Sequence, residues 1–390
     1  MTIDNLSRRQ FLKAGGIGLV GILATRANAW SSQNHHFTLF VGTYTAETKS
    51  EGIYGYYSSP EIGSLNRYNS FKSVNPSYLA ITQGNDYLYA VNEVGEYEGK
   101  PSGAVSAFAL DARSKDSLRL LNQQPTLGAD PCYVTVDSKR KNLLVANYTG
   151  GSVTVLPIRA DGSLGEATDV KQHEGSGPKE QQKGPHAHCI ILDRAEKYAL
   201  ASDLGADKIM IYRYDGKRGK LTPNKQPFVQ LQAGAGPRHL TFHPSGKYLY
   251  AINELDSTLS SFKYDDDDGE LKPIETVSTL PAGFTGVSYC ADVHIHNSGK
   301  FLYGSNRGHN SIVVFEIERG NGKVKLVEHV STQGDWPRNF AIDPYGHHLL
   351  VANQRSNNVV TFRIDTETGR LISELRVDEK IPAPVCLKFV

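Results

Sequence analysis

Residues 236–254 read GPRHLTFHPSGKYLYAINE: an alternating apolar run, a turn containing Gly246, and a second apolar run that ends in Asn253-Glu254. Alternation of this kind is typical of β-strands, and the glycine-containing turn predicts that the two strands form a hairpin. The same pattern recurs without gaps at five other places, in the segments 76–93, 131–148, 187–204, 290–307 and 337–354. An internal repeat of six units therefore decides the fold.

Each repeat unit predicts four strands. A third apolar run such as SIVVFEI (311–317) follows each hairpin, and a more variable fourth segment closes the unit. Four strands in every ~50 residues are typical of a β-propeller blade. The composition agrees, because 37 Gly and 20 Tyr against 2 Met favour strands and turns. No amphipathic helix of useful length follows residue 30, which argues against a helical solenoid.

The two ends of the chain supply a seventh blade. The segment PVCLKFV (384–390) resembles the first strand of a unit, FTLFVGTYT (37–45) the second and GIYGYYS (52–58) the third. A blade built from both ends closes the ring and leaves no sheet edge open. We therefore predict an all-β fold, a single seven-bladed β-propeller of four-stranded blades that occupies residues 30–390.

The first 29 residues predict a removable leader. The segment SRRQFLK (7–13) matches a twin-arginine export signal, a mildly apolar stretch follows at 14–24, and Ala27-Asn28-Ala29 offers a cleavage site before Trp30. We expect this signal to direct the protein to the periplasm or another exported location. The apolar stretch is too short to predict a membrane span.

The net charge and the cysteine spacing argue against several classes of partner and site. The formal net charge of +1 gives no reason to expect nucleic acid or a membrane surface as a partner. None of the four cysteines is in C-x-x-C spacing, so neither a zinc site nor a redox motif is expected. The repeat places the four in different units and predicts buried free thiols at Cys132, Cys189, Cys290 and Cys386.

The repeat register locates the candidate site. First strands line the central channel of a propeller, so equivalent positions form rings, and function is expected where those rings carry chemistry. The second position of each unit holds Ser77, Cys132, His188, Arg238, Ala291, Arg338 and Val385. The last position holds Glu93, Tyr148, Leu204, Glu254, Arg307 and Gln354, with Tyr44 in the closing blade. The register predicts one channel mouth with His188, Arg238, Glu254 and Arg307 as catalytic candidates, and with Tyr44, Glu93, Tyr148, Arg338 and Gln354 as substrate-binding candidates.

Other polar residues are interpreted structurally. Four histidines fall on strand positions without the spacing of a ligand motif and are expected in the core or in turns: His239, His243, His294 and His296. The acidic run 265–268 is expected in a solvated loop, because it lacks the offsets of a calcium-binding loop. No G-x-S-x-G motif supports a serine nucleophile. The sequence therefore predicts no metal site.

Three segments, GPHAHCIILD (184–193), GAGPRHLTFHPSGKYLYAINEL (234–255) and SNRGHNSIVVFEI (305–317), resemble the seven-bladed lactonase family. That family includes propeller-type 6-phosphogluconolactonases and a fungal carboxy-cis,cis-muconate cyclase, and the resemblance covers residues 37–390. It implies that the His, Arg, Glu and Arg proposed as active-site residues in the cyclase branch correspond to His188, Arg238, Glu254 and Arg307. It also implies cofactor-free hydrolysis of a sugar-type lactone or a related carboxylated substrate.

Several roles and readings stay open at this point. The arginines can stabilise the oxyanion or clamp a carboxylate or phosphate, and either Glu254 or neutral His188 can activate water. A lactone-forming muconate-type cycloisomerase would use the same four residues. A non-catalytic exported binding propeller would use them for recognition, and a six-bladed metal-dependent gluconolactonase would instead need an axial divalent ion.

Overall fold

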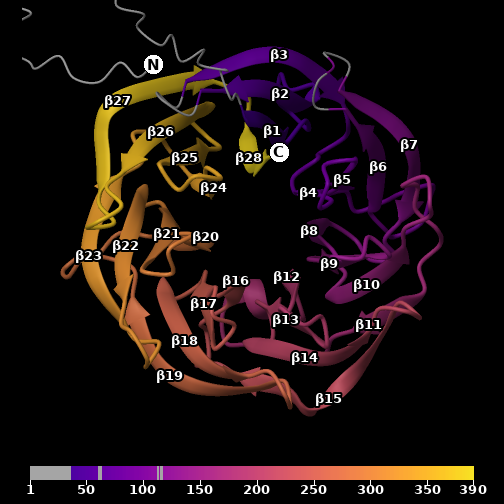
Figure 1. Cartoon of the computed structure of the whole chain (residues 1–390). Coiled ribbons are helices and arrows are strands. Elements are labelled where there is room, and N and C mark those ends of the chain that lie inside the picture. The colour runs from indigo at the N-terminus through magenta and orange to yellow at the C-terminus, as the bar shows by residue number, and fades with distance from the viewer. Residues whose placement is uncertain (1–36, 60–63, 112–113, 115–116) are drawn as a thin grey trace, which may run out of the picture. The chain divides into compact units, whose positions relative to one another are not determined.

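Residues 37–390, apart from 60–63, 112–113 and 115–116, are described by the computed structural model. They form seven four-stranded antiparallel sheets arranged as blades of one ring (Figure 1). The predicted seven-bladed propeller is confirmed. The predicted export signal at residues 1–29, and the predicted start of the domain at residue 30, lie outside the described residues.

Six blades follow one another along the chain, each running from the channel outward. Blade 1 contains β4 (Leu79–Ile81), β5 (Tyr87–Asn92), β6 (Ala104–Leu110) and β7 (Leu118–Pro125). Blade 2 contains β8 (Pro131–Val136), β9 (Asn142–Asn147), β10 (Ser152–Pro157) and β11 (Asp169–Gln172). Blade 3 contains β12 (Ala187–Leu192), β13 (Tyr198–Asp203), β14 (Lys208–Asp215) and β15 (Lys220–Gln230).

The next three blades repeat this order. Blade 4 contains β16 (Pro237–Phe242), β17 (Tyr248–Asn253), β18 (Thr258–Asp265) and β19 (Glu270–Ser278). Blade 5 contains β20 (Tyr289–Ile295), β21 (Phe301–Arg307), β22 (Ser311–Ile317) and β23 (Val324–Ser331). Blade 6 contains β24 (Pro337–Ile342), β25 (His348–Asn353), β26 (Asn358–Ile364) and β27 (Leu371–Lys380).

The seventh blade joins the two ends of the described chain. Its innermost strand is β28 (Pro384–Phe389), followed outward by β1 (Phe37–Thr43), β2 (Gly52–Ser58) and β3 (Leu65–Lys72). Strands β28 and β1 are antiparallel, with Val41 opposite Leu387 and Leu39 opposite Phe389. The predicted closure is confirmed, and it removes the open sheet edge that either end would otherwise expose.

The core lies between neighbouring blades. Every residue of β21 is buried, whereas the outer strand β23 of the same blade is largely half-buried or exposed. Blades pack face to face, so that Tyr303 and Val314 of blade 5 share one apolar cluster with Phe340 and Val360 of blade 6. The inner strands are therefore apolar on both faces, and polar side chains along the channel need a separate reason.

A recurring tyrosine joins one blade to the outer hairpin of the next. The hydroxyl of Tyr250 donates to the Gly322 carbonyl at 3.1 Å, and the Tyr303 hydroxyl donates to the Gly369 carbonyl at 2.9 Å. Gly322 has φ +72°, and a Cβ there would lie 2.3 Å from the ring of Tyr248. Glycine is required at this turn both by its left-handed backbone and by the close approach of the neighbouring blade.

Tyr250→Phe is expected to lower the unfolding free energy by about 1–2 kcal/mol, because it leaves a buried carbonyl without its donor. Denaturant-induced unfolding measures the change. Tyr345→Phe is the control, since Tyr345 is 54% exposed, and it should change the stability by less than about 0.5 kcal/mol. Equal stability of the two variants would show that this inter-blade hydrogen bond contributes nothing.

A β-bulge sits at the second residue of most inner strands. In β16, Pro237 pairs with Asn253 and His239 with Ile252, which leaves Arg238 as the extra residue. Register shifts at the same repeat position leave His188 unpaired in β12 and Arg338 unpaired in β24. Bulges re-aim side chains and interrupt the ladder. The bulge therefore allows a polar side chain to point into the channel at a position where the alternating pattern of the strand would place an apolar one.

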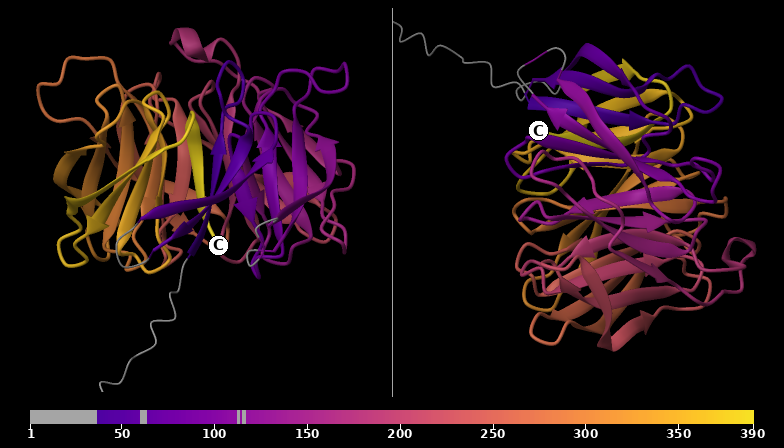
Figure 2. Two further views of the ribbon diagram at one scale, coloured as in Figure 1. Left: turned by 90° about the horizontal axis from the view of Figure 1, so that it is seen from above. Right: turned by 90° about the vertical axis from the view of Figure 1, so that its right-hand side faces the viewer.

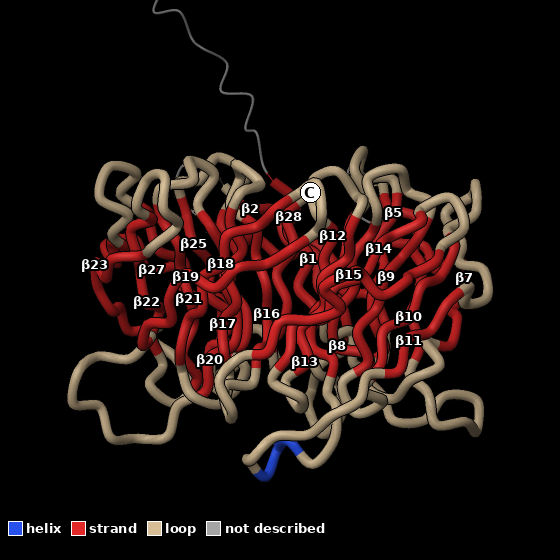
Figure 3. The backbone as a smooth tube through the Cα atoms, turned by 90° about the horizontal axis from the view of Figure 1, so that it is seen from below, coloured by secondary structure: helices blue, strands red, loops and turns tan. Residues whose placement is uncertain are grey.

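Both rings of candidate residues lie at one end of the blades, where the first strands begin and the second strands finish. The loops that precede β12 and β20 project from this same end (Figure 2). The first of them carries the short 3-10 helix η1 (Glu180–Gln182), coloured blue in Figure 3. Strand β28 finishes at the opposite end. Among the described residues, no helix has the length and apolar character needed to cross a membrane.

Candidate active site

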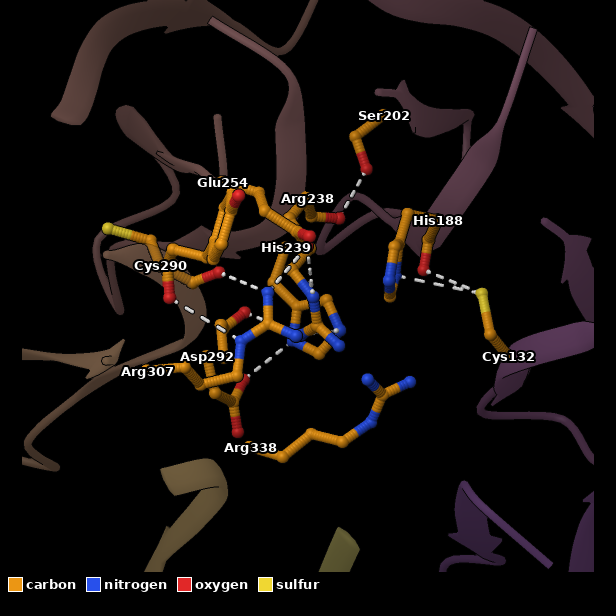
Figure 4. A network of polar contacts seen from close by, with 12 residues as sticks. Cys132, His188, Ser202, Arg238, His239, Glu254, Cys290, Asp292, Arg307 and Arg338 are labelled. Atoms are coloured by element: carbon orange, nitrogen blue, oxygen red, sulfur yellow. Dashed lines mark hydrogen bonds and ion pairs between the residues drawn. The ribbon is translucent and has the colours of Figure 1, made fainter. Parts of the chain in front are cut away.

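One carboxylate joins two buried arginines from neighbouring blades (Figure 4). Glu254, directly after β17, places Oε2 3.0 Å from Nε of Arg238 and 2.8 Å from Nη2 of Arg307. Arg238 comes from the bulge of β16, and Arg307 is the last residue of β21. Three of the four catalytic candidates are thus in direct contact, although 69 residues of sequence separate the first from the last.

Backbone carbonyls of β20 hold the same two guanidinium groups. Arg238 donates from Nη1 to the Ala291 carbonyl at 2.6 Å, and Arg307 donates from Nη2 to the Cys290 carbonyl at 2.9 Å. The side chains of Arg238 and Arg307 are 2% and 5% exposed, against 17% for Glu254. The cations are therefore fixed in the wall of the channel, and the carboxylate is the member of the group that meets solvent.

The charged side chains in this group shift one another's pKa values. Burial alone would raise the pKa of Glu254, but the attraction of Arg307, followed by Arg238 and Arg338, holds that pKa below its usual range. Burial lowers the pKa of Arg307 to about 10, with Glu254 opposing the shift and Arg238 and Arg338 adding to it. At neutral pH the group therefore contains an ionised carboxylate and charged guanidinium groups.

His188 lies beside this cluster, at the bulge of β12. Its ring is buried, with Nδ1 3.6 Å from Sγ of Cys132, and it packs edge-on against the rings of Tyr148 and His239 at centroid distances of 5.4 and 5.3 Å. Burial, followed by the nearby charge of Arg238, lowers the pKa of His188 well below its usual range. His188 is therefore a neutral imidazole at pH 7.

A second polar group occupies the same channel mouth. Glu93 follows β5 and accepts at Oε1 from the Tyr44 hydroxyl at 2.7 Å, and its Oε2 accepts from Ser77. Arg338 donates from Nη2 to the Tyr44 hydroxyl at 2.7 Å, with Glu93 Oε1 4.0 Å away. This group is adjacent to the first, because the charge of Arg338 acts on both Glu254 and His188.

Tyr148 and Gln354 make no hydrogen bond to Glu93 or Arg338 among those seen in the described residues, unlike Tyr44. Burial, followed by the charge of Glu254, raises the pKa of Tyr148 to about 12, and its ring stacks on His186 at 4.5 Å. The Oε1 atom of Gln354 is buried and has no hydrogen-bond partner among the described residues. The backbone N–H of Gln354 donates to the Trp336 carbonyl at 3.0 Å.

Trp336 is a site residue that the repeat comparison did not single out. The guanidinium of Arg307 lies 5.3 Å from its ring centroid, and that of Arg355 lies 3.4 Å away. Its backbone has φ +66°, in the region where the corresponding Gly236 has φ +63°. A bulky aromatic in this conformation is strained. The sequence feature that could have identified Trp336 is its place before Pro337, where the unit that begins at Pro237 has a glycine.

The four cysteines are free and buried, as predicted. The acidic run 265–268 is exposed at the turn between β18 and β19, as predicted for a solvated loop. Among the described residues, its members Asp265, Asp266 and Asp267 are the one group whose ligand atoms lie close enough together to hold a metal ion. A cavity of about 670 Å³ opens at the opposite end of blades 4 and 5, beside Lys247, Lys300 and Glu318. None of the ring candidates lines it, so the channel mouth remains the candidate site on grounds of convergent chemistry.

Comparisons with known proteins agree with the seven-bladed fold. A family described as a seven-bladed β-propeller lactonase matches residues 38–389. The 6-phosphogluconolactonase of Bacillus subtilis (strain 168) is 39% identical over 352 residues, which cover 90% of this chain and 97% of the relative. That of Formosa agariphila is 36% identical over 85% of this chain and 94% of its own length. The solved Pseudomonas aeruginosa periplasmic gluconolactonase has a TM-score of 0.86 at 33% identity, over 91% of this chain and 99% of that one.

Proposed function

Since this chain belongs to the seven-bladed β-propeller lactonase family, we propose that it hydrolyses a sugar-type lactone in the channel mouth that holds Arg238, Glu254 and Arg307. The observation that carries the proposal is the single carboxylate oxygen of Glu254 held between two buried guanidinium groups. The arrangement supplies fixed positive charge beside a solvent-facing base. Ester hydrolysis needs both, because negative charge develops on the carbonyl oxygen as water attacks.

The reaction follows from these groups. Glu254 or neutral His188 takes a proton from water, and the resulting hydroxide bonds to the lactone carbonyl carbon. Arg238 and Arg307 donate to the oxyanion that forms. Collapse of this intermediate breaks the ring C–O bond, and the departing alkoxide takes the proton to give a hydroxy acid. Every step uses side chains of this protein alone, so no cofactor is required.

The substrate is expected to be anionic or to carry many hydroxyl groups. The mouth contains three arginines, Arg238, Arg307 and Arg338, against two carboxylates, Glu254 and Glu93, so its net charge is positive. We assign Tyr44, Glu93, Tyr148, Arg338 and Gln354 to substrate binding. Hydroxyl groups of a sugar lactone suit the Tyr44–Glu93 pair, whereas a carboxylate or phosphate suits Arg338.

The proposed location favours an unphosphorylated substrate. The leader at residues 1–29 predicts export, after which residues 30–390 would function as the mature domain. A structurally similar protein is a periplasmic gluconolactonase, whereas the curated relatives are 6-phosphogluconolactonases. An exported enzyme meets lactones outside the cytoplasm, so we place gluconolactone-type compounds ahead of their 6-phosphates.

Purified protein is expected to release acid from glucono-1,5-lactone, followed with a pH indicator, and to keep this activity after exhaustive treatment with EDTA. The 6-phosphate is assayed beside it. Loss of activity on chelation would favour a metal-dependent lactonase. Lactone formation from a carboxymuconate, with no acid release from any sugar lactone, would assign the site to a cycloisomerase. Inactivity on both substrate classes would leave a binding propeller.

A further inference from the structure

We propose that His239 and Asp292 are positioning residues for lactone hydrolysis, which fix the orientation of the Arg238 guanidinium from the side away from the substrate. The inference rests on the proposed function, because it concerns the arginine assigned to the oxyanion. It starts from a chain of contacts that runs from Glu254 through Arg238 and His239 to Asp292 (Figure 4). The repeat pattern predicted only that His239 lies in the core or in a turn.

The direction of each hydrogen bond in this chain is fixed by chemistry. Asp292 can only accept, so the contact of 2.7 Å between its Oδ1 and Nδ1 of His239 places the proton on Nδ1. Burial, followed by repulsion from Arg238, lowers the pKa of His239 to about 4, so the ring is neutral. Its Nε2 therefore accepts from Nη1 of Arg238, at 3.1 Å. Changing the tautomer would present an N–H donor to the arginine, and flipping the ring would present a C–H group.

Asp292 is itself held by a residue of its own strand, β20, and by a residue of blade 6. Its Oδ2 accepts from Nε2 of His294 at 2.9 Å and from the side-chain amide of Asn339. The amide oxygen of Asn339 in turn accepts from the Leu387 N–H of β28 at 2.7 Å. Burial alone would raise the pKa of Asp292, but His294 and His239 hold it well below its usual range. The carboxylate is therefore ionised, although its side chain is 2% exposed.

Together these contacts leave the Arg238 guanidinium one orientation. Its Nε lies 3.0 Å from Oε2 of Glu254 as an ion pair without hydrogen-bond alignment, and its Nη1 donates to the Ala291 carbonyl and to His239. Within the described residues, no hydrogen bond occupies Nη2, and we assign this nitrogen to the substrate oxygen. An oxyanion site depends on donors that are oriented before the reaction, and a displacement of about 1 Å can lower the rate 10²-fold.

We place His239 and Asp292 outside the proposed substrate site. Both line a separate cavity of about 280 Å³, together with His294, Tyr78, Tyr133 and Lys388. This cavity lies on the other side of Arg238, towards the end of the channel where β28 finishes. The two residues therefore act through Arg238, which makes them positioning residues and not catalytic ones.

Asp292→Asn is the first test, and the protein provides a matched control. Asp343 forms an equally buried pair with His348, at 2.9 Å, in the turn after β24 and away from the site. In the Asp292 variant the new amide N–H group must face other donors, from Asn339, His294 or His239. We expect kcat per folded molecule to fall about 10- to 100-fold with KM changed less than about 3-fold, whereas Asp343→Asn should leave both nearly unchanged. Similar kcat values for the two variants would overturn the inference.

A pair of substitutions at His239 covers the case in which Asp292→Asn does not fold. His239→Gln keeps a donor and an acceptor, whereas His239→Phe keeps the ring and loses both. We expect the Gln variant to have at least about 5 times the kcat of the Phe variant. Equal kcat values would contradict the positioning role. Arg238→Ala distinguishes failure of the proposed function from failure of the positioning role. Substantial activity in Arg238→Ala contradicts the proposed function itself. An inactive Arg238→Ala together with equal kcat values for the two His239 variants contradicts only the positioning role.

Discussion

Glu254→Gln is expected to lower kcat for lactone hydrolysis about 10³-fold, the order of magnitude associated with loss of a positioned acid–base group. The substitution preserves shape but removes the charge that Arg238 and Arg307 share at 3.0 and 2.8 Å. A neutral amide cannot take a proton from water. It also lacks the negative charge with which the carboxylate attracts the two arginines. Initial rates across a substrate range separate kcat from KM.

Glu93→Gln is the comparison variant, because Glu93 occupies the same repeat position as Glu254 in another blade. Glu93 accepts from the Tyr44 hydroxyl and lies 4.0 Å from Arg338, so its assigned role is binding. We expect a rise in KM of about 10-fold with kcat reduced much less, as for the loss of one or two hydrogen bonds to substrate. If Glu254→Gln lowered kcat less than about 10-fold, Glu254 would not be essential to the reaction.

The stability of the Glu254 variant must be measured alongside its rate. Removing one partner from a buried ion pair costs about 3 kcal/mol, because the remaining cations stay buried without their counter-charge. Rates are therefore normalised to folded protein, using circular dichroism and denaturant unfolding. A loss of activity that merely follows the folded fraction would assign Glu254 a structural role.

The repeat register made the composition of the site predictable. Arg238 and Glu254 occupy the second and last positions of one unit, and Arg307 occupies the last position of the next unit. Because blades are copies of one structural unit, equivalent positions lie at equivalent heights around one channel. The alignment therefore predicted that these three side chains share a mouth, and in the structure they are in direct contact.

The alignment did not predict how the second residue of each unit reaches the channel. Strict alternation assigns Arg238 to one face of the strand, whereas the structure has an extra residue there, and the register shifts between Pro237 and His239. A bulge leaves no signature in the alternation of apolar residues. Its location could have been suspected from the proline that begins several of the units, because proline cannot donate to the ladder.

The roles of His239 and Trp336 were missed for different physical reasons. His239 follows the bulge, so its pairing with Asp292 across 53 residues depends on the shifted register. Trp336 lies one residue before the aligned unit, where only the backbone angle shows that a bulky side chain occupies a position suited to glycine. Both residues contact an arginine of the candidate site, and contacts of this kind are not revealed by a single sequence.

Deleting residues 384–390 is expected to abolish folding, although only the last strand is removed. Val385, Cys386 and Leu387 are at most 2% exposed, and burying a Val or Leu side chain contributes about 1.5–3 kcal/mol. Removing β28 also exposes the edge of β1 and withdraws Asn339's partner, the N–H of Leu387. The combined loss is comparable with the stability of a typical domain, about 5–15 kcal/mol.

Size-exclusion chromatography and circular dichroism of a chain ending at Ala383 test this expectation. We expect aggregated material without a cooperative unfolding transition, because the unpaired edge of β1 can pair with other molecules. Deleting Val390 alone is the control: it removes one backbone hydrogen bond, from the Val390 N–H to the Thr38 carbonyl at 2.8 Å, and should leave folded protein that elutes like the full-length chain. Soluble protein from the longer deletion that elutes like the full-length chain and has normal lactonase activity would mean that the site forms without the closing strand.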